Sequence, residues 1–269
     1  MTKFLTTDFE FKQQWFADLR LLASKNLSQA HLMQHQQMAK NVLDLAGINN
    51  NASGAHSHIK PADTVEYHDQ TITGKKHWVS NAADAEYGVF TVKGFDIVYV
   101  PDLKASTKIN FIDTLGMEET RTADIEFDHT PAVKLFNKSN AGVAQLFHIH
   151  DICFITNQFG VAEGLYKNTK TSDPMIELQL NALNLLWESL LPISEIKEVD
   201  RQKQKQIDTV YAFGKFTLVN VLEHVLKTSS SGLYNTNAAG HQLYKDALIY
   251  SSHGRNLQKS FEKEFVTTY

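Results

Sequence analysis

The segments GKKHWVSN (residues 74–81) and EYGVFTVKGFDIVYVP (residues 86–101) decide the fold class of this chain. β-Branched and aromatic residues dominate both segments, which is typical of β-strands. Lys93 and Gly94 separate two such runs, as in a hairpin, and Pro101 ends the second run because proline has no N–H for a strand ladder. We therefore predict an antiparallel sheet in the middle of the chain.

Further strands are expected on both sides of these segments. TVEYHDQTITG (64–74) has the pattern of two short strands around an Asp-containing turn. KINFIDT (108–114), TADIEFD (122–128) and AVKLF (132–136) continue the β pattern.

Helical periodicity precedes the predicted sheet. Apolar residues recur at helical spacing between residues 7 and 24, and a second helix is expected from Ser28, as its N-cap, to Gly47, its C-terminal stop. We expect a loop over residues 49–57.

Helical periodicity returns after the sheet, in four long segments from about residue 141. Asp173 and Pro174 supply an N-cap followed by a first-turn proline for one of them. The order of elements predicts an α+β fold with an N-terminal helical segment (1–50), an antiparallel middle β-domain (51–138) and a C-terminal four-helix bundle (139–269).

The composition limits the kind of partner. The chain has 269 residues, 42% of them hydrophobic, and a formal net charge of -4, which argues against nucleic acid and favours a small molecule or a protein. Cys153 is its single cysteine, so neither an internal disulfide nor a cysteine-rich metal site is expected. Lacking a signal-peptide core and any uncharged run long enough to span a bilayer, the sequence predicts a cytoplasmic protein with no membrane span.

Three ordered motifs resemble the middle domain of the acyl-CoA dehydrogenase superfamily. GKKHWVSN (74–81) is similar to the family's Gly-x-Lys-x-Trp-Ile-(Ser/Thr)-Asn segment, IVYVP (97–101) to a strand that ends in Val-Pro, and LGMEETRTADIEFDHTPA (115–132) to the segment that closes the domain. FITNQFGVAEGLYKN (154–168) resembles the first helix of the family's C-terminal bundle. The chain thus looks like a shortened, divergent member of this fold.

The resemblance implies a flavin site and a reaction. Its cofactor would be FAD, and its substrate an acyl-CoA or a related thioester oxidised at a CH–CH group. In the family the motif tryptophan lies against the flavin ring, so the cofactor-binding candidates are those at the matching positions: Trp78, Val79, Ser80, Thr120 and Thr122. The alternative for Trp78 is a strand aromatic in a core. The family also implies a homodimer or homotetramer.

The catalytic base of the family has no counterpart at its expected position. Where members carry a glutamate in Ile-Tyr-Glu-Gly-Thr, this chain has IYSSHG (249–254). His253, whose imidazole titrates near neutral pH, and the neighbouring Tyr250 are the catalytic candidates, although a histidine there also suits a helix terminus. An Arg-x-x-Phe-Gly element that helps to hold the dinucleotide is missing between Tyr166 and Pro174.

Three functions stay open at this point. The first is an FAD-dependent oxidoreductase of the acyl-CoA dehydrogenase type. The second is a non-catalytic relative that serves as a binding or assembly subunit. The third is a flavin-dependent monooxygenase, which needs a protected pocket more than a substrate base.

Several histidines invite comparison with metal ligands. His56 and His58, and likewise His148 and His150, are two residues apart, a spacing that converges on one face only in a strand. Residues 148–150 fall in a predicted helix, where positions two apart diverge. His31 and His35 share a helix face, but the sequence offers them no evident third ligand. The sequence therefore predicts no metal site.

Overall fold

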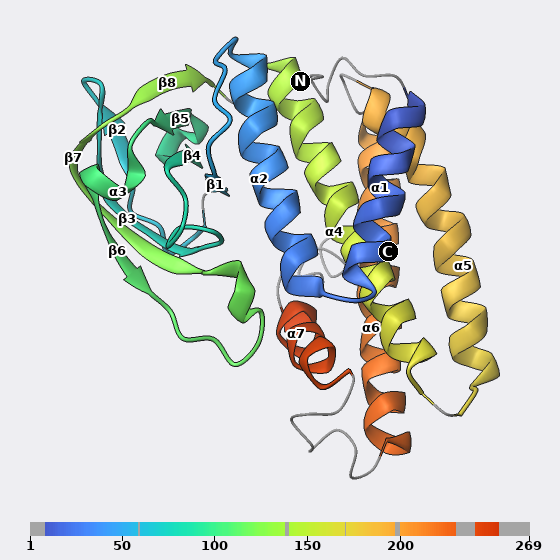
Figure 1. The fold of residues 1–269 in the computed structure, drawn as a ribbon. Helices are drawn as coiled ribbons and strands as arrows, with labels where there is room; N and C mark the ends of the chain where they lie inside the picture. The colour runs from blue at the N-terminus through green and yellow to red at the C-terminus, as the bar shows by residue number, and fades with distance from the viewer. Residues whose placement is uncertain are drawn as a thin grey trace, which may run out of the picture.

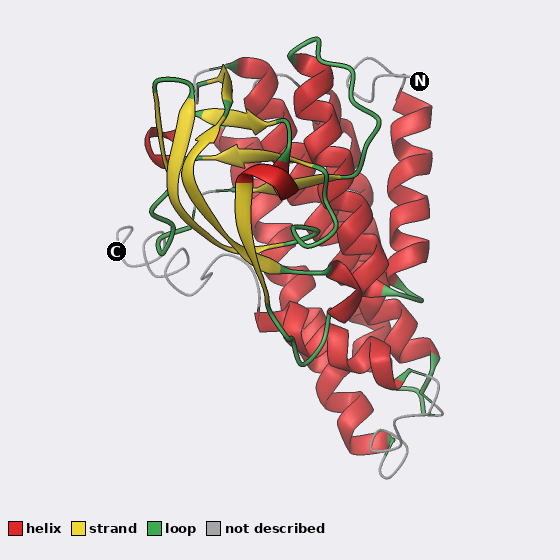
Figure 2. Cartoon of the chain, turned by 60° about the vertical axis from the view of Figure 1, so that its left-hand side comes forward, coloured by secondary structure: helices red, strands yellow, loops and turns green. Residues whose placement is uncertain are grey.

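The computed structural model describes residues 9–58, 60–137, 140–169, 171–196, 200–229 and 240–252. It is an α+β protein in which the strands lie to one side of a set of long helices (Figure 1). A second view shows the strands as a separate layer in front of the helices (Figure 2).

The long helices occupy both ends of the described part of the chain, and the strands with three short helical turns occupy its middle. The helical elements are α1 (Phe9–Ala23), α2 (Leu27–Leu45), η2 (Lys93–Phe95), α3 (Leu103–Ser106), η3 (Glu118–Thr120), α4 (Ala141–Lys167), α5 (Pro174–Leu190), η4 (Leu191–Glu195), α6 (Arg201–Thr228) and α7 (His241–Ser252). The strands are β1 (Gly54–Ser57), β2 (Glu66–His68), β3 (Thr71–Val79), β4 (Tyr87–Thr91), β5 (Ile97–Val100), β6 (Thr107–Phe111), β7 (Ala123–Pro131) and β8 (Val133–Phe136).

The strands form two four-stranded sheets with the orders β1-β4-β5-β8 and β2-β3-β7-β6. Apolar side chains of both sheets, among them Ile72, Phe90, Val98 and Ile125, form one buried core. Alternate residues of the first sheet, Tyr87 and Val89, belong instead to the helical core. β4 is buried along its whole length because it has the sandwich on one face and helices on the other.

The helices share a single large core. α1 and α2 contribute Phe16, Leu19 and Val42 to the same cluster as Ile152 of α4 and Leu218 of α6. The N-terminal helices therefore pack with the C-terminal ones, and α2 lies between them and the sheets (Figure 1). The domain boundaries given above stay a prediction.

Two local predictions were wrong. Residues 54–57, expected to be loop, form β1, which pairs in parallel with β4 in the register Gly54↔Tyr87, so the sheet is not purely antiparallel. The N-cap of α2 is Asn26, whose side chain accepts a hydrogen bond from the Gln29 N–H at 3.0 Å. Ser28 instead lies inside the helix and donates to Asp246 Oδ2 at 2.7 Å.

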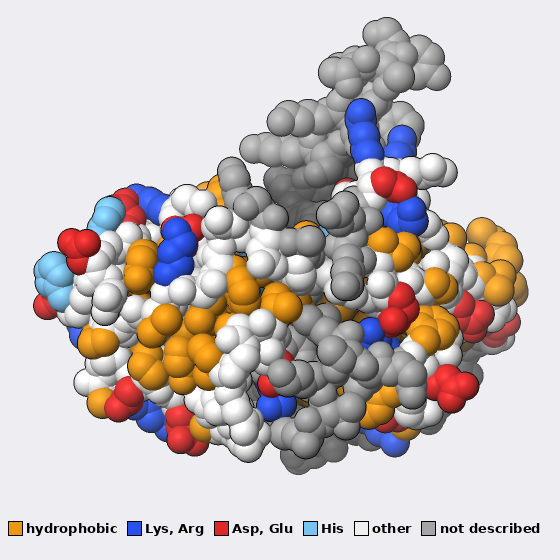
Figure 3. Space-filling model, turned by 90° about the horizontal axis from the view of Figure 1, so that it is seen from above, with side chains coloured by type: hydrophobic (Ala, Val, Ile, Leu, Met, Phe, Trp, Pro, Cys, Tyr) orange, Lys and Arg blue, Asp and Glu red, His pale blue; other side chains and the backbone are white. Residues whose placement is uncertain are grey.

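Other local predictions are confirmed. β4 and β5 form the hairpin around Lys93 and Gly94, and Asp173 caps α5 with Pro174 in the first turn. Seen from above, acidic and basic side chains are interspersed over the face (Figure 3). Within the described residues, no helix is both long enough and apolar enough to cross a membrane.

Candidate functional site

A cavity of about 700 Å³ lies where α2, β1, the end of β3, η3, α4 and α7 meet. One part of its wall is made of a tryptophan and hydroxyl side chains, and another part is made of histidines. Phe154 of α4 and Tyr250 of α7 add aromatic surface between them.

A β-bulge places Trp78 at this cavity. The pairing of β3 with β7 shifts register between Lys76 and Val79, and Trp78 has a left-handed backbone with φ of 54°. Asp124 holds the bulge, since its Oδ1 accepts from the Trp78 N–H at 3.0 Å and its Oδ2 lies 3.0 Å from His77 Nδ1. Lys60 Nζ also donates to the Trp78 carbonyl at 2.6 Å. Trp78 is consequently 50% exposed and lines the cavity. It is therefore not a strand aromatic packed in the core, which was the alternative from the sequence.

The predicted hydroxyl groups line the same cavity. Ser80 Oγ lies 3.2 Å from His31 Nε2. Thr120 Oγ1 donates to the Met117 carbonyl at 2.6 Å and lies 2.8 Å from Thr122 Oγ1, so the Thr122 hydroxyl donates to Thr120. All three residues are part of the cavity wall.

Val79 differs from the other cofactor candidates. Its side chain is fully buried in the core between the two sheets and is not part of the described cavity wall. A β-strand turns successive side chains to opposite faces, so a residue between two cavity-lining neighbours points away from them. The structure therefore gives Val79 a packing position.

Tyr250 of α7 reaches the cavity, whereas His253 lies outside the described residues. The Tyr250 ring stacks on Phe154 with centroids 5.7 Å apart and is only 2% exposed. Burial raises the pKa of Tyr250 well above its ordinary value, so its phenol stays protonated at neutral pH. Tyr250 can therefore donate a hydrogen bond but is unsuited to act as a base.

The remaining wall is a histidine cluster, defined here as His31, His35, His56, His58 and His150. The rings are in contact, with centroid distances of 4.4 Å for His31 and His35 and 4.6 Å for both His56 with His58 and His58 with His150. α2, β1 with the residue after it, and α4 bring them together. The sequence did not predict this convergence.

Burial keeps the deepest members of the cluster neutral. Desolvation, followed by the neighbouring histidines, lowers the pKa of His56 and of His150 well below 6.5. Lys60 at the edge of the cavity has its pKa lowered to about 8, chiefly by burial and next by Lys76. The cavity thus offers uncharged imidazoles at neutral pH.

The sequence carried one signal of the cluster. His31 and His35 are four residues apart on α2, and Gln34 lies between them, yet all three are buried on a face where a helix usually carries apolar residues. Polar residues on the core-facing side of a helix indicate that this side contacts a polar cavity. Their partners from β1 and α4 could not be read from spacing.

Comparison with solved structures identifies the fold as one found in flavoproteins. The HsaA monooxygenase from M. tuberculosis matches with a TM-score of 0.72 and 13% identity over 94% of this chain and 79% of that one. KijD3, solved with FMN and dTDP-3-amino-2,3,6-trideoxy-4-keto-3-methyl-D-glucose, matches with a TM-score of 0.71 and 12% identity over 94% and 79% of the two chains. The electron transferring flavoprotein of Acidaminococcus fermentans gives a TM-score of 0.76 and 12% identity over 94% and 82%.

These structural similarities define the class of fold and do not extend to function. Neither a protein-family model nor a curated protein matches the sequence. At 12–13% identity, the solved structures show a shared architecture and nothing finer.

The cavity wall suits a flavin ring. An exposed indole offers a flat surface for stacking. The Ser80 hydroxyl can donate to or accept from polar ring-edge atoms, whereas the hydroxyls of Thr120 and Thr122, whose protons are already donated, can accept from them. A volume of about 700 Å³ falls within the range of ligand pockets. The residues present therefore fit the group that the fold suggests.

Proposed function

We propose that this protein is a flavin-dependent oxidoreductase whose flavin ring stacks on Trp78 and meets the hydroxyls of Ser80, Thr120 and Thr122. One observation carries the proposal: these residues, chosen from the sequence, line a single cavity in a fold shared with flavoproteins. When bound, the flavin would supply the two-electron chemistry. FAD and FMN both remain candidates.

Among the possible reactions, we favour oxygen-dependent hydroxylation of a small molecule over dehydrogenation of an acyl-CoA. Removal of an α-proton needs a general base in the pocket, usually a carboxylate. The described residues of the cavity wall include no aspartate or glutamate, and the Tyr250 phenol is protonated. The aromatic rings and neutral imidazoles of the wall are better suited to shielding a bound flavin from water.

Flavin uptake tests the proposal directly. The full chain should take up FAD or FMN with quenching of flavin fluorescence and a shifted visible spectrum. Trp78→Ala should weaken uptake at least about tenfold, since stacking on an aromatic ring contributes on the order of 1–3 kcal/mol. Phe111→Ala is the matched control because Phe111 is a 52% exposed aromatic of the same sheet that does not line the cavity.

Two further measurements separate the reactions. A monooxygenase should consume oxygen when reduced flavin is supplied by a separate reductase, and should not reduce an electron-acceptor dye in the presence of acyl-CoA. The opposite pattern would indicate a dehydrogenase. Absence of flavin uptake together with a stable homodimer or homotetramer would favour the non-catalytic subunit.

A further inference from the structure

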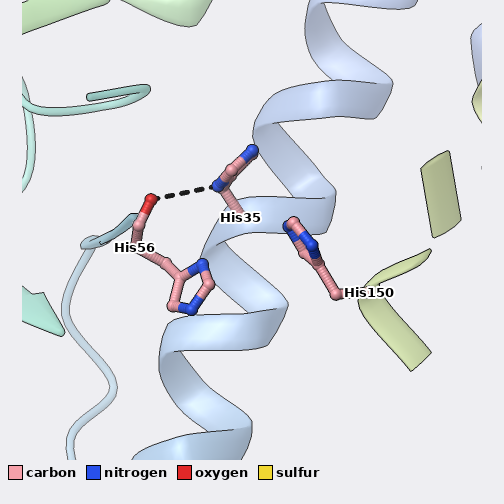
Figure 4. Close-up of side chains that lie close together, drawn as sticks. All are labelled: His35, His56 and His150. Atoms are coloured by element: carbon pink, nitrogen blue, oxygen red, sulfur yellow. Dashed lines mark hydrogen bonds between the residues drawn. The ribbon is translucent and has the colours of Figure 1, made fainter. Parts of the chain in front are cut away.

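Three histidines of the cluster bring their ring nitrogens together in the wall of the cavity. One ring nitrogen from each of His35, His56 and His150 lies within 4.8 Å of the others. The three residues are only 8%, 2% and 4% exposed. Figure 4 shows their side chains converging from α2, the β1 segment and α4.

The hydrogen bonds around these rings leave nitrogens suited to a ligand. His35 Nδ1 lies 3.1 Å from the His56 carbonyl oxygen, which can only accept (Figure 4). Nδ1 of His35 therefore carries the proton, and Nε2 keeps its lone pair. Histidines that bind metals commonly donate their other N–H to a backbone carbonyl in this way.

The other two rings also offer ligand atoms. His150 Nδ1 lies 3.2 Å from His58 Nε2, so in one tautomer His150 donates to His58 and keeps a lone pair on Nε2. Within the part of the chain that the structure describes, neither His150 Nε2 nor His56 Nδ1 has a hydrogen-bond partner. Buried polar atoms normally have a hydrogen-bond partner, and an ion or a water in the cavity could supply one to these two nitrogens.

We propose that His35, His56 and His150 bind one divalent transition-metal ion of the zinc type, with His35 Nε2, His56 Nδ1 and His150 Nε2 as its ligands and His58 as a positioning residue. Imidazole nitrogens suit zinc, copper, iron and nickel, whereas calcium and magnesium require oxygen ligands. Three histidines with a fourth position open to the cavity are a known arrangement for zinc.

The geometry allows an ion after a small movement. Ligands at about 2.1 Å in a tetrahedral site lie about 3.4 Å from one another, so ring nitrogens that lie up to 4.8 Å apart have to approach by up to about 1.4 Å. The cavity beside them leaves room for rotamer changes. The ammonium group of Lys76 near this site is already paired with Asp63 at 3.0 Å, which limits its repulsion of a cation.

Cobalt and zinc titrations of the full chain test the site. Protein that has been treated with EDTA and then dialysed should bind one Co²⁺ per chain with the visible absorption of a four-coordinate nitrogen site, and Zn²⁺ should displace it. Each of His35→Gln, His56→Gln and His150→Gln should lower Zn²⁺ affinity by more than about 100-fold, because even outer-shell changes cost 10–100-fold. His58→Gln should lower Zn²⁺ affinity by about 10–100-fold, as expected for a positioning residue.

His68→Gln provides the matched control. The His68 side chain is 75% exposed, and this variant should bind Co²⁺ and Zn²⁺ like the wild type. Circular dichroism of each variant checks that it is folded. If the cavity variants fail to fold, thermal unfolding of the wild type still tests the site. Zn²⁺ at about 100 times its dissociation constant should raise the Tm of the wild type by about 5 °C.

Two results would overturn the metal site: less than one ion bound per chain, or stoichiometric binding that persists in folded His35, His56 and His150 variants. The proposal does not depend on the flavin. Titrations of flavin-free protein measure the ion alone, so failure of flavin uptake and failure of metal binding are separate outcomes.

Discussion

Lys76 anchors the strand that carries Trp78. Its ammonium is fully buried, lies 3.0 Å from Asp63 Oδ2, and donates to the carbonyls of His58 and Thr91 at 3.1 Å and 2.9 Å. Asp63 in turn accepts from the backbone N–H groups of Lys60 and His77. This small network joins β3 to β4 and to the histidine-bearing segment after β1.

We expect Asp63→Asn to destabilise the protein by about 3–5 kcal/mol at pH 7, because it leaves the Lys76 charge buried without its counter-ion. Urea unfolding measures the loss. Asp113→Asn, at an exposed position, should change stability by less than about 0.5 kcal/mol. Equal effects of the two substitutions would contradict the role of the pair.

The same carboxylate predicts a pH dependence. Burial by itself raises the pKa of Asp63, but Lys76 and the hydrogen bonds from His77 and Lys60 outweigh it, so the pKa lies below 3.8. A folded pKa below the unfolded one gives stability that is present above pH 4 and is lost as the pH falls through the folded value. The difference in free energy of unfolding between the wild type and Asp63→Asn should therefore become smaller in urea titrations repeated at about pH 3.

Some of the residues at the cavity could be predicted from the sequence and others could not. Trp78 and Ser80 could be predicted because a short contiguous motif contains both, and their resemblance to a known segment survives sequence divergence. The contact of His35 with His56 and His150 could not, since it depends on how α2, β1 and α4 pack. The pairing of Lys76 with Asp63 also required the tertiary structure.

Two glycines of α4 allow α1 to approach closely. A Cβ at Gly160 would lie 2.3 Å from the Arg20 carbonyl oxygen, and one at Gly164 would lie 2.0 Å from that of Ser24. Both obstacles are backbone atoms at the end of α1. The glycines, four residues apart on one helix face, therefore fix how the N-terminal and C-terminal helices pack.

Gly164→Ala should lower stability by about 1–3 kcal/mol, because overpacking against backbone outweighs the roughly 1 kcal/mol gain in helix propensity. Gly214→Ala in α6 is the matched control. Its Cβ would meet Gln158 Oε1 at 2.7 Å, the far end of a flexible side chain, so stability should stay level or rise slightly. Thermal unfolding compares the two, and a stable Gly164→Ala would refute the close packing.

Among the described strands, β1 is the one that the sequence failed to predict. It has only four residues, GAHS, and lacks the β-branched residues that signal a strand. Its pairing partner β4 is more than thirty residues away in the chain, so local pattern carried no information about it. The longer elements were predicted because their periodicity extends over many residues.

One buried carboxylate connects distant parts of the fold. Asp246 of α7 accepts from Ser28 Oγ of α2, from the Met117 backbone N–H next to η3, and from Gln242, each at 2.7 Å. These elements form one side of the cavity. The position of α7 against the remainder of the wall thus depends on a single side chain.

Asp246→Ala should cost about 3 kcal/mol, since it leaves buried donors on α2 and beside η3 without an acceptor. Hydrogen exchange should also become faster over residues 117–122. Lys245→Ala is a neighbouring control, because the Lys245 pair with Glu118 at 2.7 Å is partly exposed and should contribute less than about 1 kcal/mol. Unchanged exchange in Asp246→Ala would contradict the connection.

The architecture was predictable to a greater extent than the cavity. The succession of helical and strand periodicities indicated an α+β fold, and the resemblance supplied its arrangement. The cavity is made by side chains from segments distributed along most of the chain. Its chemistry therefore emerges only when α2 and α7 are placed against the sheets.

The left-handed backbone of Trp78 implies that the protein sacrifices thermal stability to place an indole at this position. A bulky L-residue in that conformation carries a strain of about 1–2 kcal/mol that glycine would not. Trp78→Gly should hence melt at the same temperature as the wild type or higher, although glycine inside a strand normally destabilises. Calorimetry of the ligand-free variant checks this, and a lower melting temperature would mean that the indole stabilises the resting protein. The outcome would tell whether the Trp78 indole serves function alone or also stabilises the fold.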